Sequence, residues 1–138
     1  MELHDEFYGF FERVRHNLDF ISLSSDLRRN NISHYIYFVA TGNIKLITCT
    51  DSYISLKNHR RLVKVNGCSC SELTREAARR IFSGESTYEQ FYTELAHAGV
   101  FKWVVDLHSL TRSYWSKDNY LLHSENILSP VSQSEAVA

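Results

Sequence analysis

Hydrophobic positions follow a helical period at the start of the chain. Apolar residues recur every three or four positions over residues 5–16, which predicts an amphipathic helix. Its apolar face carries Phe7, Phe10, Phe11 and Val14. A second, short helix is expected to begin at Ser24 or Ser25, whose hydroxyls can cap a first-turn amide, and to end at residues 30–31, two asparagines. We interpret the aromatic stripe as core rather than as a filler for a partner's groove.

After these helices, the spacing of hydrophobic positions changes from every three or four residues to every second residue. Segments in which apolar and polar residues alternate, separated by turn residues, are typical of an antiparallel meander. The turns are expected at residues 41–43 and 51–52. The expected strands cover residues 33–40, 44–50, 53–56 and 62–65.

Helical patterning returns after residue 68. A capping box formed by Ser69 and Glu72 predicts a helix over residues 70–82, with one apolar face. That face carries Leu73, Ala77, Ala78 and Ile81. A further helix over 87–98 ends at Gly99, which favours a left-handed stop. Strands are then expected over residues 100–106, 110–115 and 120–124, and the aperiodic tail 129–138 should fray.

The chain also contains a weak internal similarity. Residues 26–36 can be laid on residues 94–104, and seven of the eleven pairs agree in chemical type. We therefore predict an α+β fold of two similar α-α-β-β-β halves about a pseudo-twofold axis, near residues 5–66 and 69–127, in one domain over 1–128. Convergence of helix-stop-strand junctions on the same residue types is the alternative explanation.

Length and composition limit the classes of protein. The 138 residues are 43% hydrophobic and 22% charged, which is typical of one globular domain. No apolar run approaches the roughly 18 residues of a membrane span, and the first six residues are acidic rather than those of a signal peptide. Three cysteines, an odd number, fit a reducing compartment. We expect a cytoplasmic protein without membrane contact.

Charge is distributed unevenly behind a net charge of −1. Residues 28–80 carry ten basic and three acidic side chains, whereas the segments on either side each have a net charge of −4. Acidic ends folded over a basic centre would neutralise it; a surface for a polyanion or an acidic partner is the alternative. The candidate patch for such a partner consists of Lys57, Arg60, Arg61, Lys64, Arg75, Arg79 and Arg80.

Nucleic acid is one partner that this patch would fit. Tyr35 or Tyr37 would then offer stacking faces for single strands. A helix-turn-helix geometry for the helices over 70–82 and 87–98 is excluded, because Glu89 and Glu94 on the second helix would repel phosphates. Local pairing of Glu72 and Glu76 with arginines of the same helix speaks against the patch.

Metal, cofactor and catalytic motifs are weak. The four residues Cys49, His59, Cys68 and Cys70 lack the paired spacing of a zinc site, so we predict no metal. The five glycines stand singly, which gives nucleotide cofactors no support. The pairs Asp106/His108 and His123/Glu125 have the right chemistry for a general base, but no nucleophile has a recognisable setting.

Two stretches resemble a known family. The run FYTELAHAGVFKWVV at residues 91–105, and SHYIY at 33–37 followed by Ala40 and Thr41, resemble the YdfO-like family of small prophage and bacterial proteins. The likeness covers most of residues 5–127, and AGV-x-x-W is its most specific part. It implies an α+β domain, cytoplasmic and prophage-borne, of unknown function and with no catalytic residue to carry over.

Among functions, the sequence favours a non-catalytic module that binds a protein. Thirteen percent aromatic residues supply material for binding anchors. Nucleic-acid binding through the basic segment 57–80 is the alternative, and a hydrolase that uses His108 or His123 is a third hypothesis.

Overall fold

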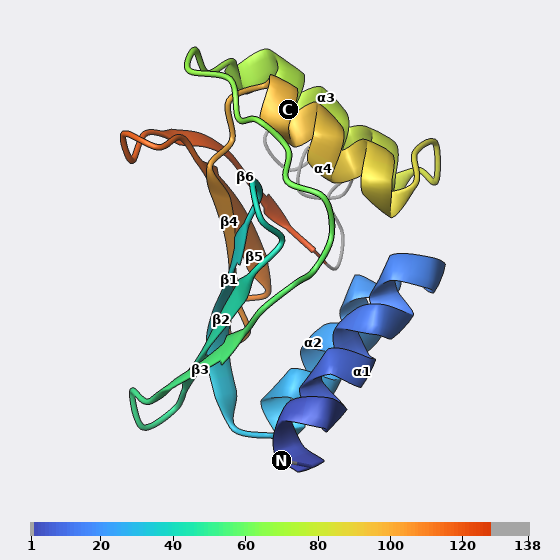
Figure 1. The fold of residues 1–138 in the computed structure, drawn as a ribbon, viewed down its shortest axis with the longest axis vertical. Coiled ribbons are helices and arrows are strands. Elements are labelled where there is room, and N and C mark those ends of the chain that lie inside the picture. Colours follow the sequence, from blue (N-terminus) through green and yellow to red (C-terminus); the bar gives the residue numbers. More distant parts are fainter. Residues whose placement is uncertain (1, 128–138) are drawn as a thin grey trace.

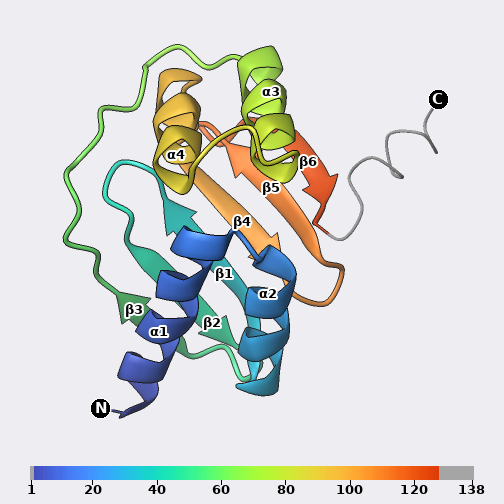
Figure 2. The same cartoon turned by 90° about the vertical axis from the view of Figure 1, so that its right-hand side faces the viewer.

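The computed structural model describes residues 2–127, in which six strands form one antiparallel sheet with four helices on one face (Figures 1 and 2). The helices are α1 (Glu2–Asn17), α2 (Phe20–Arg29), α3 (Ser71–Phe82) and α4 (Tyr88–His97). The strands are β1 (Ile32–Phe38), β2 (Ile44–Thr48), β3 (Tyr53–Leu56), β4 (Lys102–Asp106), β5 (Thr111–Trp115) and β6 (Leu121–Asn126). The predicted α+β class is confirmed, and the tail 129–138 lies outside the described residues.

The sheet has the order β3-β2-β1-β4-β5-β6. Its central ladder pairs β1 with β4, from His34 opposite Asp106 to Phe38 opposite Lys102. Two helices precede three strands on each side of this ladder, and the strand order runs outward from it in both directions. The internal repeat, its halves 5–66 and 69–127 and the domain bounds 1–128 stay predictions.

The start of α2 was predicted wrongly. The helix begins at Phe20, because Asp19 caps it: the Asp19 carboxylate accepts from both the backbone N–H and the hydroxyl of Ser22. Ser24 instead lies buried inside the helix, where its hydroxyl donates to the Phe20 carbonyl oxygen at 2.9 Å. The expected asparagine terminator is confirmed, with Asn31 in the left-handed conformation at φ 70°.

The fourth strand of the first meander, expected over residues 62–65, does not form. The chain from β3 to α3 runs as a long loop beside the sheet and helices (Figures 1 and 2). Its backbone bonds go to other loops and to a helix end instead of a strand: Val63 N–H donates to Ala40 and Asn66 N–H to Ala96. Leu62, part of the alternating pattern, is 70% exposed.

The first turn of α3 also differs from the prediction. The N-cap is Cys70, without a side-chain cap, so the capping box of Ser69 and Glu72 is wrong. The backbone N–H of Cys70 donates to the Ala98 carbonyl oxygen at 2.8 Å and fixes the helix start against the end of α4. On the buried face Thr74 takes the place expected for Leu73, which is 47% exposed.

The end of α4 is the predicted glycine stop. Gly99 has φ +83°, and a Cβ at this position would lie 2.6 Å from the carbonyl oxygen of Cys68. Only glycine accommodates both the left-handed backbone and the close approach of the preceding loop. This contact brings the long loop against the start of β4.

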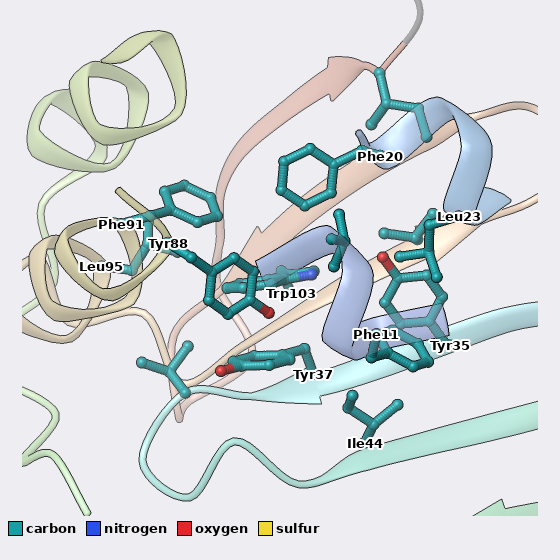
Figure 3. Packing of buried hydrophobic residues seen from close by; sticks show 14 of the residues in the cluster. Phe11, Phe20, Leu23, Tyr35, Tyr37, Ile44, Tyr88, Phe91, Leu95 and Trp103 are labelled. Atoms are coloured by element: carbon teal, nitrogen blue, oxygen red, sulfur yellow. The ribbon is translucent and has the colours of Figure 1, made fainter. Parts of the chain in front are cut away.

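The core lies between the helices and the inward face of the sheet, and it is rich in rings (Figure 3). Tyr37 stacks on Trp103 with centroids 4.0 Å apart, and Phe11 of α1 packs edge-on against Tyr35. Tyr35 and Tyr37 are 3% and 1% exposed, so neither offers a stacking face to a nucleic acid. Within the described residues, no helix combines the length and the apolar character that a bilayer span requires.

Candidate functional site

A charged cluster lies in this aromatic core. Arg112 of β5 and Glu125 of β6 pair across the ladder with both side chains on the inward face. The Arg112 Nε donates to Glu125 Oε2 at 2.9 Å, and the Tyr114 hydroxyl donates to the same oxygen at 2.5 Å. The side chains of the arginine and the glutamate are 0% and 6% exposed. A charge taken so far from water requires a partner, and this pair provides it.

Aromatic rings surround the guanidinium of Arg112. Its central carbon lies 4.7–5.9 Å from five ring centroids. These rings belong to Phe20, Phe82, Phe91, Trp103 and Tyr114. Phe20 belongs to the first helix pair, whereas Phe82 and Phe91 belong to the second. Figure 3 shows Phe20 and Phe91 approaching Trp103 from the two pairs. Arg112 therefore lies beneath the seam between α1–α2 and α3–α4.

Most of the hydrogen-bonding capacity of this cluster is unused. A guanidinium has five N–H donors, and in Arg112 only the Nε donor has a partner among the described residues. Both Nη atoms are buried without an acceptor among the described residues. Each unsatisfied buried donor costs about 1–3 kcal/mol, and cation–π contacts of about 0.5–2 kcal/mol offset only part of that.

Burial and charge shift the pKa values of this cluster in opposite directions. Burial alone would raise the pKa of Glu125, but the charge of Arg112 and the hydrogen bonds from His123, Tyr114 and Arg112 together outweigh it, and the net shift is downward. Burial raises the pKa of Tyr114 well above its usual value. It also raises the pKa of Tyr35 to about 12, against the opposing charge of Arg112. At neutral pH the cluster thus holds an ionised pair and neutral tyrosines.

The two acid–base pairs predicted from the sequence, Asp106/His108 and His123/Glu125, differ in whether their side chains meet. His123 and Glu125 do share a face, with His123 Nε2 3.6 Å from Glu125 Oε1 and its ring stacked on Tyr114. Asp106 instead accepts from the backbone N–H of His108 in an exposed turn, and this bond lowers the pKa of Asp106 although burial alone would raise it. The hydrolase hypothesis stays a prediction; neither His108 nor His123 lines any of three hollows on the surface of the described residues.

The candidate basic patch separates into two groups. Arg60 is drawn inward, where its two Nη atoms donate to Tyr37 and to nearby backbone carbonyls and its guanidinium lies 3.9 Å from the Tyr92 centroid. Arg79 pairs with two glutamates of its own helix region, and Arg80 pairs with Glu94 of α4.

The other members of the patch are exposed and make no ion pair with a described residue. They are Lys57, Arg61, Lys64 and Arg75. Three of them lie on the long loop and one lies on α3, so the structure leaves them as a chain of single charges rather than one compact cluster.

The second face of the sheet has no helix over it (Figure 1). The register places five apolar side chains there: half-buried Ile36, Phe38, Val104 and Trp115, and buried Ile47. The polar side chains among them are His34, Lys45, Lys102, Asp106, Thr111 and Ser113. We call this surface the open face. An antiparallel sheet with one solvated face normally shows polar residues outward, so the apolar row is a missed functional signal.

An open hollow of about 410 Å³ adjoins this face. Phe38 and Phe101 line it with rings packed edge to face at 5.9 Å, and Lys45 and Lys57 line it as well. Its other lining residues are Ala40, Thr41, Asn43, Ile44, Ser55 and Leu56. The hollow can therefore accept an apolar side chain that is flanked by negative charge.

The cysteines do not meet. Cys49 and Cys68 are exposed and Cys70 is half-buried, all as free thiols. In the described part of the chain, no group of three or more histidine, cysteine, aspartate or glutamate side chains is arranged to hold a metal ion.

Comparison with known proteins identifies the family. A model described as "Protein of unknown function (DUF1398)" matches residues 9–126. The uncharacterized protein YcgX of Escherichia coli (strain K12) is 40% identical over 121 residues, covering 88% of this chain and 90% of YcgX. The uncharacterized protein YbcV of the same strain is 36% identical over 121 residues, covering 88% and 89%. The chain belongs to the DUF1398 family.

Proposed function

We propose that this member of the DUF1398 family is a non-catalytic module that binds another protein through the open face of its sheet. The observation that carries the proposal is the apolar row of the open face, which no described helix covers. Buried aromatic anchors dominate protein interfaces, and Trp115 and Phe38 stand on this face. A cytoplasmic and prophage-borne protein, as the resemblance to the YdfO-like family implies, remains part of the proposal; free thiols fit a reducing compartment.

The hollow beside the open face defines the chemistry of the partner. The rings of Phe38 and Phe101 line it together with Lys45 and Lys57. A partner segment with an aromatic or aliphatic side chain next to carboxylates would pack against the rings and pair with the lysines. Contacts of opposite charge guide such an encounter and weaken with added salt.

Site-specific photo-crosslinking tests this proposal in the cells that express the protein. The photoreactive residue p-benzoylphenylalanine replaces Ser55, which lines the hollow, or Ser25, an exposed serine of α2, as the matched control. We expect a discrete protein adduct from Ser55 and none from Ser25. The purified partner, identified by mass spectrometry, should bind the protein in calorimetry and lose at least about tenfold in affinity against Phe101→Glu, which is about 1.4 kcal/mol.

Three outcomes would contradict the proposal. One is equal crosslinking from Ser55 and Ser25. Another is a partner whose affinity is unchanged by Phe101→Glu. The third is an adduct that contains only further copies of this chain, which would make the open face a dimer interface.

Nucleic-acid binding is the second candidate, supported by the exposed charges of Lys57, Arg61 and Lys64. Anisotropy of labelled single-stranded DNA, duplex DNA and RNA at low and near-physiological salt tests it. Binding should weaken with a log–log slope near −0.9 per phosphate contact on duplex DNA. The variant Lys57→Ala/Arg61→Ala/Lys64→Ala should remove it. Arg60 is left unchanged, because its substitution would test the fold instead. An unaltered affinity of the triple variant would reject this candidate.

A further inference from the structure

We propose that Arg112 anchors a binding site for a small organic carboxylate, entered at the seam between the two helix pairs. This site is independent of the protein-binding proposal, because it lies on the helix-covered face of the sheet rather than on the open face. Arg112 is fully buried, and both of its Nη atoms lack an acceptor among the described residues.

The free edge of the guanidinium determines the shape of the ligand's polar end. Glu125 occupies the Nε of Arg112, so Nη1 and Nη2 remain as two adjacent donors. Two parallel N–H···O bonds from such a fork match the two oxygens of a carboxylate. The indole ring of Trp103, with its centroid 5.9 Å from the guanidinium carbon, forms one wall of the site. The two free Nη groups of Arg112 can only donate, so the polar end of the ligand must accept.

The surroundings determine the rest of the ligand. Phe20, Phe82 and Phe91 lie around the guanidinium and exclude water from it. Such a wall favours a flat or aliphatic body over a hydrated ion.

The entrance is placed by two residues at helix ends. Phe20 is the first residue of α2 and Phe82 is the last residue of α3, and these helices belong to different pairs. Figure 2 shows the α1–α2 turn beside the loop that joins α3 to α4. Phe20 is 7% exposed and Phe82 is half-buried, so the proposal places the entrance at these helix ends, where the rings must change rotamer to admit a ligand.

Tryptophan fluorescence can test this site directly. The chain has two tryptophans, and Trp115→Phe leaves Trp103 as the only reporter. In that background benzoate is the carboxylate probe, benzyl alcohol its neutral analogue, and inorganic phosphate the ion without an apolar body. We expect a saturable change in Trp103 emission with benzoate, and binding at least about tenfold weaker for each of the other two compounds.

Arginine variants separate a ligand site from a structural contact. Arg112→Lys keeps the charge but removes the fork, and Arg112→Met/Glu125→Gln removes the ion pair. Both should weaken benzoate binding at least about tenfold, whereas Arg28→Met on the exposed side of α2 should not. Phe82→Glu leaves Arg112 in place and puts a tethered carboxylate at the entrance, so it should compete with benzoate by a similar factor.

The proposal fails if wild-type protein shows no saturable response to benzoate. It also fails if benzoate binds the double variant as tightly as wild type, or if phosphate binds as tightly as benzoate. Circular dichroism establishes that each variant is folded. Where the Arg112 variants do not fold, Phe82→Glu decides: unchanged benzoate affinity in this variant rejects the site.

Discussion

Arg60 and Arg112 both pack their guanidinium groups against aromatic rings, but they donate hydrogen bonds from opposite parts of that group. In Arg60 both Nη atoms donate, to the Tyr37 hydroxyl and to backbone carbonyls such as that of Val39, while Nε has no partner. In Arg112 the Nε donates to Glu125, while both Nη atoms have no partner among the described residues. Arg60 is half-buried in the long loop, whereas Arg112 is fully buried under the helices.

The difference separates a structural arginine from a candidate binding arginine. Arg60 ties the long loop to the end of β1, and its bonds to backbone carbonyls satisfy acceptors that the loop would otherwise leave open. Arg112 ties two neighbouring strands that already share a ladder, so its charge adds little to the connection between them. A buried ion pair of this kind is weak support for stability.

The largest effect is expected from breaking the Arg112 pair on one side. Glu125→Gln leaves the guanidinium of Arg112 buried without a counter-charge. We expect the free energy of unfolding to fall by about 3–5 kcal/mol. Urea unfolding followed by circular dichroism measures it. A loss below about 1 kcal/mol would show that the aromatic rings alone are sufficient for the charge.

A smaller loss is expected from the other arginine. Arg60→Met removes the donors to the carbonyls of Val39 and Ala40 but leaves no buried charge behind. The expected loss is about 1–3 kcal/mol in the same urea experiment. Arg61→Met, at an exposed neighbouring position, is the matched control and should change stability by less than about 0.5 kcal/mol. An equal loss of stability in Arg60→Met and Arg61→Met would contradict a structural role for Arg60.

The ionised pair of Arg112 and Glu125 also predicts how the stability of the protein depends on pH in the acidic range. The pKa of Glu125 is lower in the folded protein, so its contribution is present above the unfolded value of about 4.3 and is lost as pH falls through the folded value. Wild-type stability should therefore fall faster than that of Glu125→Gln below that pH. Unfolding in urea at a series of acidic pH values measures the gap between the two proteins. A constant gap would contradict the ionised pair.

The smallest effect is expected when both charges are removed together. Arg112→Met/Glu125→Gln leaves no buried charge, and the glutamine oxygen can still accept from the Tyr114 hydroxyl. We expect its free energy of unfolding to lie within about 1 kcal/mol of wild type. If the double variant is as unstable as Glu125→Gln alone, the ion pair is required for stability and Arg112 is a structural arginine like Arg60.

Much of the fold could be predicted from the local pattern of apolar, polar and turn residues along the sequence. Period-two alternation predicted all six strands that form, and Gly99 and Asn31 predicted their left-handed stops. The errors arose where a tertiary contact decides: Asp19 rather than a serine caps α2, and Cys70 opens α3 through a bond to Ala98. Residues 62–65 alternate like a strand, but no neighbouring strand pairs with them.

The candidate site was less accessible to sequence reasoning. The shared face of His123 and Glu125 followed from their spacing, but Arg112 was missed. A signal for it was present, because Arg112 stands two residues before Tyr114 and so occupies the inward phase of its strand. Its meaning depends on Phe20 and Phe82, which come from helices far away in the chain. In the basic segment, only tertiary structure shows that Arg60 points inward.

The central ladder of the sheet also bears on how the chain reaches this fold. Among the described strands, β1–β4 is the one pairing between segments far apart in sequence; the others join successive strands. Loops between distant segments close at a greater entropic cost than hairpins do, and they form later. Until β4 docks on β1, both strands are unpaired edges open to other chains. We therefore expect the β1–β4 pairing, with Ile36 opposite Val104 near its middle, to limit the speed of refolding and the losses to aggregation.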